Sequence, residues 1–293
     1  MSEITLSVII PITKMAGKLS NLQKTFEECT GNDIEFVIVH DEQDMDTQIE
    51  LEGLISLFPN LKIKHFRETF NSPGLARNYG ISKSTGSWFS FSDSDDVPHT
   101  ANLIKTVKDA EKANAVVGIG KLLKVSEDKD SIVESKYLEG FHRNSLATLV
   151  RNPSFTRFVF RSKEFNSIAF PKIKMAEDQV YLARSKFLDH KIYVSDLLLY
   201  KYYVNVPNQA TKNPISLKEL SASLPLIYNL KSLSSSKTKQ FLLMLVLKIS
   251  LTCLVRRIDT KEALRYMFLA TIHSPLNSLS LLMSFIRIKI EKR

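Results

Sequence analysis

LSVIIPI, residues 6–12, is an apolar run with the length of a single β-strand. A second such run, IEFVIVHD at residues 34–41, follows it. Near-continuous apolar character favours strands that are covered on both faces, as in a parallel sheet. Between the two runs, Leu19, Leu22 and Phe26 recur at helical spacing. The three segments together predict a unit in which a helix connects two parallel strands.

The same alternation continues to about residue 125. Further strands are predicted at 61–66, 87–93 and 115–125, and helices over 71–86 and 97–115. Strands that alternate with helices predict an α/β fold with a mostly parallel central sheet flanked by helices. Ligands of such sheets bind at the carboxyl ends of the strands, so we expect the site residues to follow strands.

The pattern changes at NVPNQATKNPIS, residues 205–216, a polar segment with two prolines that predicts a linker. We therefore expect one domain over residues 1–205 and a basic helical region over residues 216–293. In that region Ser216 and Asp259 each precede a Glu by three residues, which is typical of a helix N-terminus.

The net charge of +9 belongs to the end of the chain. Residues 231–293 contain twelve Lys and Arg against three Asp and Glu, so the rest of the chain is neutral overall. A basic segment on a neutral protein indicates contact with a polyanion, either nucleic acid or an anionic membrane surface. Nucleic-acid binding would favour aromatic residues interleaved with basic ones on a groove or sheet, and this segment is instead rich in Leu, so we expect no nucleic-acid partner.

The apolar run at 241–255 is shorter than the roughly 20 residues that span a bilayer. The stretch after it is interrupted by Pro275 and ends in basic residues, which favours an element lying at the membrane surface. The alternative is that these helices pack on the rest of the chain or on a second subunit in a homo-oligomer.

Two further features bear on the compartment. Cys29 and Cys253 are too few for a disulfide framework or a zinc cluster, and we expect two free thiols in a reducing compartment. The N-terminus, MSEITLSVII, lacks the basic and apolar segments of a signal peptide. The sequence therefore predicts a cytoplasmic protein.

Three carboxylates, Asp93, Asp95 and Asp96, follow directly on the strand predicted at 87–93. A calcium loop starting at Asp93 should have Gly and Glu where this chain has Pro98 and Ile104. Asp95 or Asp96 could instead cap the following helix. The third interpretation is a site for Mg²⁺ or Mn²⁺, ions that typically bridge one or two carboxylates to the phosphates of a substrate.

Five segments, in this order and at these separations, carry a family resemblance: SVIIP (7–11), EFVIVHD (35–41), PGLARNYGI (73–81), WFSFSDSDD (88–96) and MAEDQVYLAR (175–184). They resemble the family 2 inverting glycosyltransferases, over about residues 5–203. The resemblance implies the GT-A fold, a Rossmann-like and mostly parallel sheet flanked by helices, here with a C-terminal helical extension. It also implies transfer of a sugar from a nucleotide diphosphate donor, usually linked to UDP, to an acceptor hydroxyl.

By position, the resemblance assigns the nucleotide pocket to Pro11 and Ile12, and contact with the base to Asp41. Arg77 lies in the segment that borders the donor. Asp93 would approach the ribose, and Asp95 would coordinate Mn²⁺ or Mg²⁺ on the diphosphate, with Asp93 as the second candidate ligand.

The attacking hydroxyl also needs a proton acceptor. The resemblance assigns this general base to Asp178, and Glu177 is the second candidate. Adjacent carboxylates discourage each other's ionisation, which favours a raised pKa for one of them. The plainer interpretation is that both residues enrich the first turn of a helix, where the helix dipole favours negative charge.

The resemblance is to enzymes that build bacterial surface polysaccharides, such as capsule, O-antigen or lipooligosaccharide. We therefore expect a nucleotide-sugar donor, a saccharide or lipid-linked saccharide acceptor, and peripheral attachment to the inner face of the plasma membrane through residues 231–293. The rival hypothesis is a non-catalytic protein, either a degenerate member that keeps only nucleotide binding or a binding module with a basic tail.

Overall fold

The computed structural model describes residues 4–41, 44–126, 130–134, 143–204 and 217–275. The chain forms two compact units. The first contains Met1–Ser135, Phe155–Lys172 and His190–Pro207, and the second contains Lys136–Ser154, Ile173–Asp189 and Asn208–Arg293. The chain therefore passes between the units more than once.

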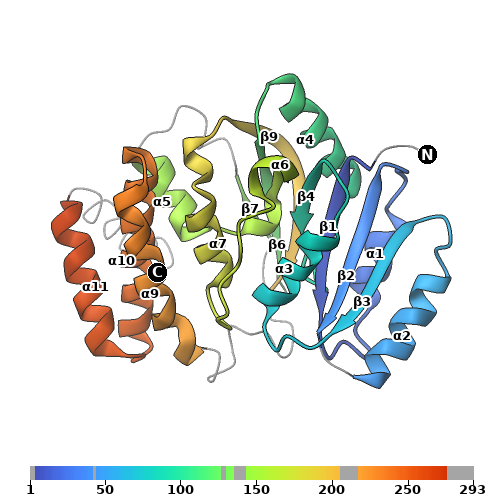
Figure 1. The fold of residues 1–293 in the computed structure, drawn as a ribbon, viewed down its shortest axis with the longest axis horizontal. Helices are drawn as coiled ribbons and strands as arrows, with labels where there is room; N and C mark the ends of the chain where they lie inside the picture. The colour runs from blue at the N-terminus through green and yellow to red at the C-terminus, as the bar shows by residue number, and fades with distance from the viewer. Residues whose placement is uncertain (1–3, 42–43, 127–129, 135–142, 205–216, 276–293) are drawn as a thin grey trace. The chain divides into compact units, whose positions relative to one another are not determined.

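The first unit is built on one sheet with the strand order β3-β2-β1-β4-β8-β6-β9-β5 and with β7 paired to β6 (Figure 1). The first four strands in sequence are parallel: β1 (Leu6–Ile12), β2 (Ile34–Asp41), β3 (Lys62–Glu68) and β4 (Trp88–Phe91). The others are β5 (Val97–Pro98), β6 (Val117–Val125), β7 (Ser131–Val133), β8 (Phe158–Arg161) and β9 (Ile192–Tyr203).

The α/β fold predicted from the sequence is confirmed, and β1 and β2 have the predicted bounds. The sheet is more mixed than predicted, because β8 runs antiparallel to both β4 and β6, and β5 runs antiparallel to β9. Strand direction cannot be read from an apolar run, since the run shows burial but not which neighbour supplies the hydrogen bonds.

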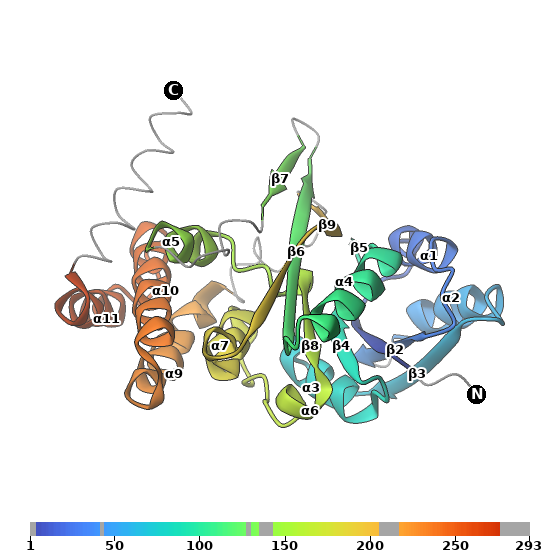
Figure 2. The same cartoon turned by 90° about the horizontal axis from the view of Figure 1, so that it is seen from above.

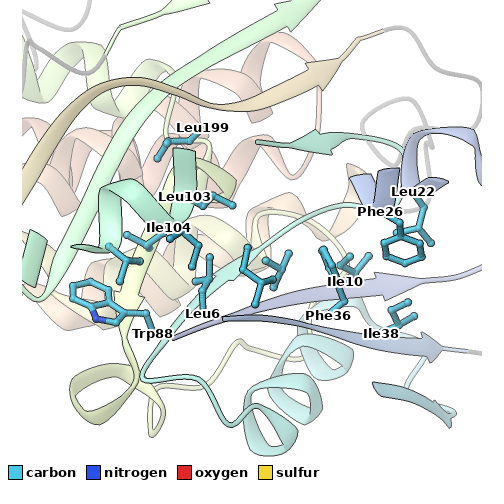
Figure 3. Packing of buried hydrophobic residues seen from close by; sticks show 14 of the residues in the cluster. Leu6, Ile10, Leu22, Phe26, Phe36, Ile38, Trp88, Leu103, Ile104 and Leu199 are labelled. Atoms are coloured by element: carbon cyan, nitrogen blue, oxygen red, sulfur yellow. The ribbon is translucent and has the colours of Figure 1, made fainter. Parts of the chain in front are cut away.

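Helices cover both faces of the parallel strands. The core on one face joins β1 and β2 to α1 (Ser20–Glu27), α2 (Met45–Ser56) and α4 (Thr100–Lys112). Figure 3 shows the part of this core that β1, β2, α1 and α4 contribute. The other face carries α3 (Pro73–Lys83), and the short α6 (Ser162–Phe165) follows β8. A Cβ added at Gly80 would lie 2.4 Å from Cγ2 of Ile9, so only glycine allows α3 to approach β1 this closely. Alternate residues of β1 therefore face two different layers.

Sequence periodicity predicts α3 well and misses α2. Ser72 caps α3 through its Oγ, which accepts from the Leu75 N–H at 3.5 Å, and Pro73 is the first helical residue, so α3 begins within the helix predicted over 71–86. In α2, Leu51 is buried while Ile49 is 64% exposed, so its apolar residues do not form a single stripe. Without a stripe there is no helical period to detect.

A buried carboxylate ties the start of the parallel strands together. Glu35 of β2 is 1% exposed and accepts hydrogen bonds from the Ser7 hydroxyl at 2.6 Å and from Thr85 N–H at 2.6 Å. Lys64 of β3 forms an ion pair with it at 2.7 Å. Burial raises the pKa of Glu35, but the contacts with Lys64, Ser7 and Thr85 outweigh it and leave the pKa lowered.

The second unit is helical. It contains α5 (Arg143–Arg151), α7 (Glu177–Ser185), α9 (Ser223–Tyr228), α10 (Ser236–Val255) and α11 (Thr260–His273), which Figure 2 shows from above. Its 3₁₀ turns are Phe187–Asp189, Glu219–Ala222 and Asn229–Leu233, and Phe155–Arg157 forms one in the first unit.

One division between the units, after Pro207, falls within the predicted linker at 205–216, a segment that lies outside the described residues, but the chain also changes unit earlier. Helices α5 and α7 precede that segment, yet both belong to the second unit. The reason is packing: the Phe187 ring meets Phe241 of α10 edge-on at 5.6 Å, and Asp189 accepts hydrogen bonds from the hydroxyls of Ser235 and Thr238.

The C-terminal helices confirm one sequence prediction and correct another. Asp259 caps α11 by accepting from Glu262 N–H at 3.5 Å, as predicted, whereas Ser216 lies outside the described residues. Helix α10 begins at Ser236 and has 20 residues, so the argument that the apolar run is too short to span a bilayer was wrong. Among the described helices it alone has the length and composition to cross a membrane, but 61% of its apolar window is buried in the structure, as in a core helix.

Candidate functional site

The predicted site residues of the first unit gather at the carboxyl ends of three neighbouring parallel strands. In the register of the sheet, Pro11 pairs with Val39 of β2, and Ile9 pairs with Phe91 of β4. The residues just beyond these strands therefore lie close together at the carboxyl ends of the strands. The strand order reverses here, because β2 and β3 lie on one side of β1 and β4 lies on the other (Figure 1). The carboxyl ends of strands at such a reversal are the usual ligand position in these sheets.

Asp93 is held by Arg77. Arg77 of α3 is only 4% exposed, and its Nη2 lies 2.6 Å from Oδ1 of Asp93, whose side chain is 36% exposed. The guanidinium also lies 4.8 Å from the ring centroid of Phe155 and 5.6 Å from that of Phe170. A buried cation needs such partners, and here they fix the orientation of the Asp93 carboxylate.

Asn78, the next residue of α3, fastens the segment that carries Phe170. Its Nδ2 donates to the Phe170 carbonyl at 3.1 Å, and its Oδ1 accepts from Phe170 N–H at 2.8 Å. This reciprocal pair places Phe170 beside the Arg77 guanidinium. Two consecutive residues of the segment PGLARNYGI therefore support Asp93: Arg77 contacts it directly, and Asn78 holds Phe170 against Arg77.

Asp96 has a different role from the helix cap that the sequence allowed. Helix α4 begins at Thr100, three residues too late for Asp96 to cap it. Instead Oδ2 of Asp96 accepts from the Tyr200 hydroxyl at 3.0 Å, and Oδ1 accepts from Tyr203 N–H at 2.8 Å. Burial, and after it the neighbouring Asp93 and Asp95, raise the pKa of Asp96 to about 9. Asp96 is thus a buried anchor between the acidic turn and β9.

Tyr200 joins the two ends of the acidic turn. Its hydroxyl oxygen accepts from Asp93 N–H at 2.9 Å while the hydroxyl donates to Asp96. Sequence reasoning missed this residue, because an aromatic residue in an apolar strand has the pattern of an ordinary core residue. No local signal distinguishes it, since its partners lie more than a hundred residues away.

Asp95 is the carboxylate of the cluster that best fits a cation. Burial, followed by the charge of Asp93, raises its pKa to about 6, so the ionised form is disfavoured in the absence of a positive partner. Asn21 of α1 fixes its backbone by donating from Nδ2 to the Asp95 carbonyl at 2.5 Å. Neither Arg77 nor the two tyrosines contact its carboxylate among the described hydrogen bonds.

The donor set suits an ion that is completed by a substrate. Within the described ranges, no three His, Cys, Asp or Glu side chains are grouped as metal ligands. Asp95 and the free side of the Asp93 carboxylate remain, while Asp96 is used by β9. Mg²⁺ and Mn²⁺ are commonly held by one or two carboxylates together with substrate phosphates, so these residues fit such an ion.

Asp41 organises the turn before α3. It is 6% exposed, and its carboxylate accepts from the backbone N–H groups of Phe70 at 2.5 Å, Asn71 at 2.9 Å and Ser72 at 3.0 Å. Asn71 has a left-handed backbone, with φ of 52°, and this conformation turns the chain toward the carboxylate. Contact of Asp41 with a base remains a prediction, and the observed role is to fix the turn that leads into α3.

Pro11 and Ile12 differ in what they can offer a ligand. The Ile12 side chain is 1% exposed and belongs to the core shared with α1. Pro11 is partly exposed on the opposite face of β1. The alternation of side chains along a strand explains the difference, and the assignment of both residues to the nucleotide pocket stays a prediction.

Glu177 and Asp178 belong to the second unit, where they begin α7. Ala176 before them has a left-handed backbone, with φ of 64°, so the chain turns sharply into the helix. Glu177 is buried and Asp178 is partly exposed. Negative charge is favoured at this helix end by the dipole, as the sequence predicted. The remaining candidates, from Pro11 to Asp95, belong to the first unit.

Comparison with known proteins gives a consistent result. Residues 7–168 match the sequence profile of glycosyl transferase family 2. An uncharacterized glycosyltransferase of Rickettsia bellii is 27% identical over 143 residues, which make up 48% of this chain and 19% of that protein. The chain thus spans about a fifth of the length of the curated relatives that it matches.

Two solved structures have a similar fold. Residues 1–349 of TarS from S. aureus, in complex with UDP-GlcNAc, superpose with a TM-score of 0.68 at 19% identity, covering 91% of this chain and 79% of that one. The mannosyltransferase PcManGT from Pyrobaculum calidifontis, in complex with GDP-Man and Mn²⁺, gives a TM-score of 0.62 at 14% identity, covering 99% and 81%.

Proposed function

Since the chain belongs to glycosyl transferase family 2, whose profile matches more than half of it, we propose that it transfers a sugar from a nucleotide diphosphate donor to an acceptor hydroxyl. The donor is a UDP-sugar, and the acceptor is a saccharide or a lipid-linked saccharide in the synthesis of a bacterial surface polysaccharide. One observation supports this most strongly: Asp93 and Asp95 follow β4 where the strand order reverses, beside the ends of β1 and β2.

The first unit would bind the donor. Pro11 and Asp93 offer a partly exposed surface at the strand ends, and Arg77 keeps the Asp93 carboxylate oriented toward a ribose hydroxyl. Asp41 holds the turn before α3, and therefore acts on the same site through Arg77. We also assign Asp41 a contact with the base, because among the described residues its Oδ2 accepts from one backbone N–H and keeps capacity for another donor.

Asp95 would hold Mn²⁺ or Mg²⁺, with Asp93 as the second ligand. When bound, such an ion supplies positive charge that stabilises the diphosphate as a leaving group. The residues of this chain provide the fixed carboxylate: Asn21 holds the backbone of Asp95, and Tyr200 and Asp96 hold the two sides of the turn. A preorganised carboxylate needs little rearrangement when the donor arrives.

Asp178 would remove the proton from the acceptor hydroxyl as that oxygen attacks the anomeric carbon, and Glu177 is the alternative base. Single displacement of this kind inverts the configuration of the sugar. Its place in the first turn of α7 supports Asp178, because a partly exposed carboxylate can reach a substrate and the helix dipole favours its ionised form.

Turnover of a panel of nucleotide sugars, followed by release of the nucleotide diphosphate with and without an added acceptor, tests the proposal. We expect turnover with Mn²⁺ for at least one donor, and Asp178→Asn should lower kcat about a hundredfold or more while leaving nucleotide binding intact. The control is Asp196→Asn, because Asp196 is an exposed carboxylate in β9 that has no role in the proposed reaction. Nucleotide binding without turnover over a broad acceptor panel would instead indicate a non-catalytic member.

A further inference from the structure

Helix α11 exposes an apolar stripe. Leu264, Phe268 and Ile272 are 51%, 64% and 58% exposed, and they follow one another at intervals of four residues, so they lie along one side of the helix. The opposite side is buried through Ala263 and Ala270, and packs within the second unit against α10 (Figure 2). Exposed apolar residues are ordinary one at a time, but a row of three large ones indicates a surface that another apolar phase covers.

A basic cavity lies where α10 turns into α11. It has a volume of about 700 Å³, and its lining includes Lys218, Ser221, Arg256, Arg257 and Asp259. Three cations thus face one carboxylate, and that carboxylate also caps α11 through Glu262 N–H. The cavity therefore has an excess of positive charge together with a hydroxyl group, which is the chemistry that binds a phosphate group.

The turn that carries this charge has an uncommon backbone. Arg257 and Asp259 have φ of 55° and 37°, in the left-handed region that favours glycine, and neither is a glycine. The conformation is held by Ile258 N–H, which donates to the Cys253 carbonyl at 2.8 Å, and by the Asp259 cap. Val255, just before the turn, is 84% exposed. Apolar and basic groups are therefore presented together at this end of the helix pair.

We propose that the apolar stripe of α11 and the basic cavity beside it form a docking surface for an anionic phospholipid bilayer. The stripe would enter the interface between headgroups and acyl chains, and the cavity would receive a lipid phosphate. The apolar stripe matches the acyl chains of such an interface, and the basic cavity matches its anionic headgroups. Amphipathic helices at membranes likewise combine a row of large apolar residues with cations nearby.

Charge complementarity selects this occupant over two others. A second copy of the chain, paired through the same surface, would bring together two surfaces that each carry the excess positive charge of Lys218, Arg256 and Arg257, and these repel. Nucleic acid would satisfy the cations but would leave the apolar stripe in water. The proposal deepens the proposed function, and rests on it only for the consequence that a membrane-bound enzyme meets a lipid-linked acceptor.

Site-directed fluorescence gives the sharpest test, because the chain has one tryptophan, Trp88, and that residue is fully buried. In the full-length Phe268→Trp protein, vesicles of phosphatidylglycerol and brominated phosphatidylcholine should shift the emission to the blue and quench it. Leu57→Trp, at a 68% exposed position in the first unit, is the matched control and should show neither change. Equal responses at the two positions, or none at residue 268, would overturn the proposal.

Vesicle co-sedimentation separates the two parts of the surface. Replacing Phe268 and Ile272 with Ser should weaken binding about tenfold or more. Lys218→Gln, Arg256→Gln and Arg257→Gln should each weaken it about fivefold on phosphatidylglycerol and not on phosphatidylcholine alone. Control substitutions at the exposed Lys105 and Lys108 should change little. Wild-type binding by the stripe or cavity variants would contradict the proposal.

Two further readouts keep other causes apart. Light scattering should give the same mass for wild type and stripe variants, and a fall in mass would assign the stripe to a second copy instead. UDP binding in Mn²⁺ should be unchanged in every stripe and cavity variant, because these substitutions lie in the second unit and the proposed nucleotide site lies in the first. If wild type binds vesicles but no nucleotide, the proposed function fails while the docking surface stands.

Discussion

Replacing Asp41 tests how the turn before α3 is built. Its carboxylate accepts three backbone N–H groups, from Phe70, Asn71 and Ser72, at 2.5 to 3.0 Å. Each hydrogen bond to a charged acceptor is worth about 1.5–3 kcal/mol, but the turn is partly exposed and its N–H groups regain water on mutation. We therefore expect Asp41→Ala to lower the free energy of unfolding by about 2–4 kcal/mol.

Asp41→Asn should cost less, about 1–2 kcal/mol, because the amide oxygen keeps one acceptor while the NH₂ group faces a backbone donor. Urea unfolding measures both values, and amide hydrogen exchange should show faster exchange at residues 70–72. The control is Glu68→Gln, since Glu68 pairs with Asp41 in the sheet register but is exposed. We expect it to stay within about 0.5 kcal/mol of wild type.

Two results would refute this reasoning. One is an Asp41→Ala protein as stable as Glu68→Gln, since the carboxylate would then not hold the turn. The other is a loss of nucleotide binding in Asp41→Asn with unchanged exchange at residues 70–72, which would mean that Asp41 acts only through direct contact with the nucleotide.

Three further predictions concern the rest of the fold. Tyr200→Phe leaves the N–H of Asp93 without its acceptor and should lower stability by about 1–3 kcal/mol in thermal or urea unfolding, while Tyr193→Phe on the same strand, whose hydroxyl contact is 3.4 Å long, should cost under about 0.5 kcal/mol. Because the pKa of Glu35 is lowered by folding, its contribution to stability is complete above the ordinary pKa of 4.5 and is lost as the pH falls below it; unfolding of Glu35→Gln should show a flatter pH dependence there than wild type. Asp259→Ala removes the α11 cap and should cost about 1 kcal/mol, a loss that Asp259→Asn should largely restore if capping is the cause.

Much of the first unit could be predicted because its parallel strands are buried on both faces. LSVIIPI and IEFVIVHD are continuous apolar runs for this reason, and their bounds follow from composition alone. The acidic turn after β4 could be found in the same way, since ligands of such sheets follow the strands. The cap of α11 is equally local, because Asp259 and Glu262 are three residues apart.

What could not be predicted depends on contacts between distant residues. The exposure of Ile49 hides α2, and the burial of Ile12 depends on which face of β1 meets α1. The partners of Asp96 come from β9, so its role as an anchor is invisible within the local sequence, which favours a helix cap instead. Likewise, the assignment of α7 to the second unit follows from packing on α10.

Binding of UDP is the most direct measurement of the central claim, that the carboxyl ends of β1, β2 and β4 form a metal-assisted nucleotide site. Calorimetric titration with UDP should give binding in Mn²⁺ that EDTA abolishes. Asp95→Ala should weaken it about tenfold or more, while Asp109→Asn, on the surface of α4, should bind as wild type does. Wild-type protein that binds no UDP in Mn²⁺, or an Asp95→Ala protein that binds it equally well, would contradict the account.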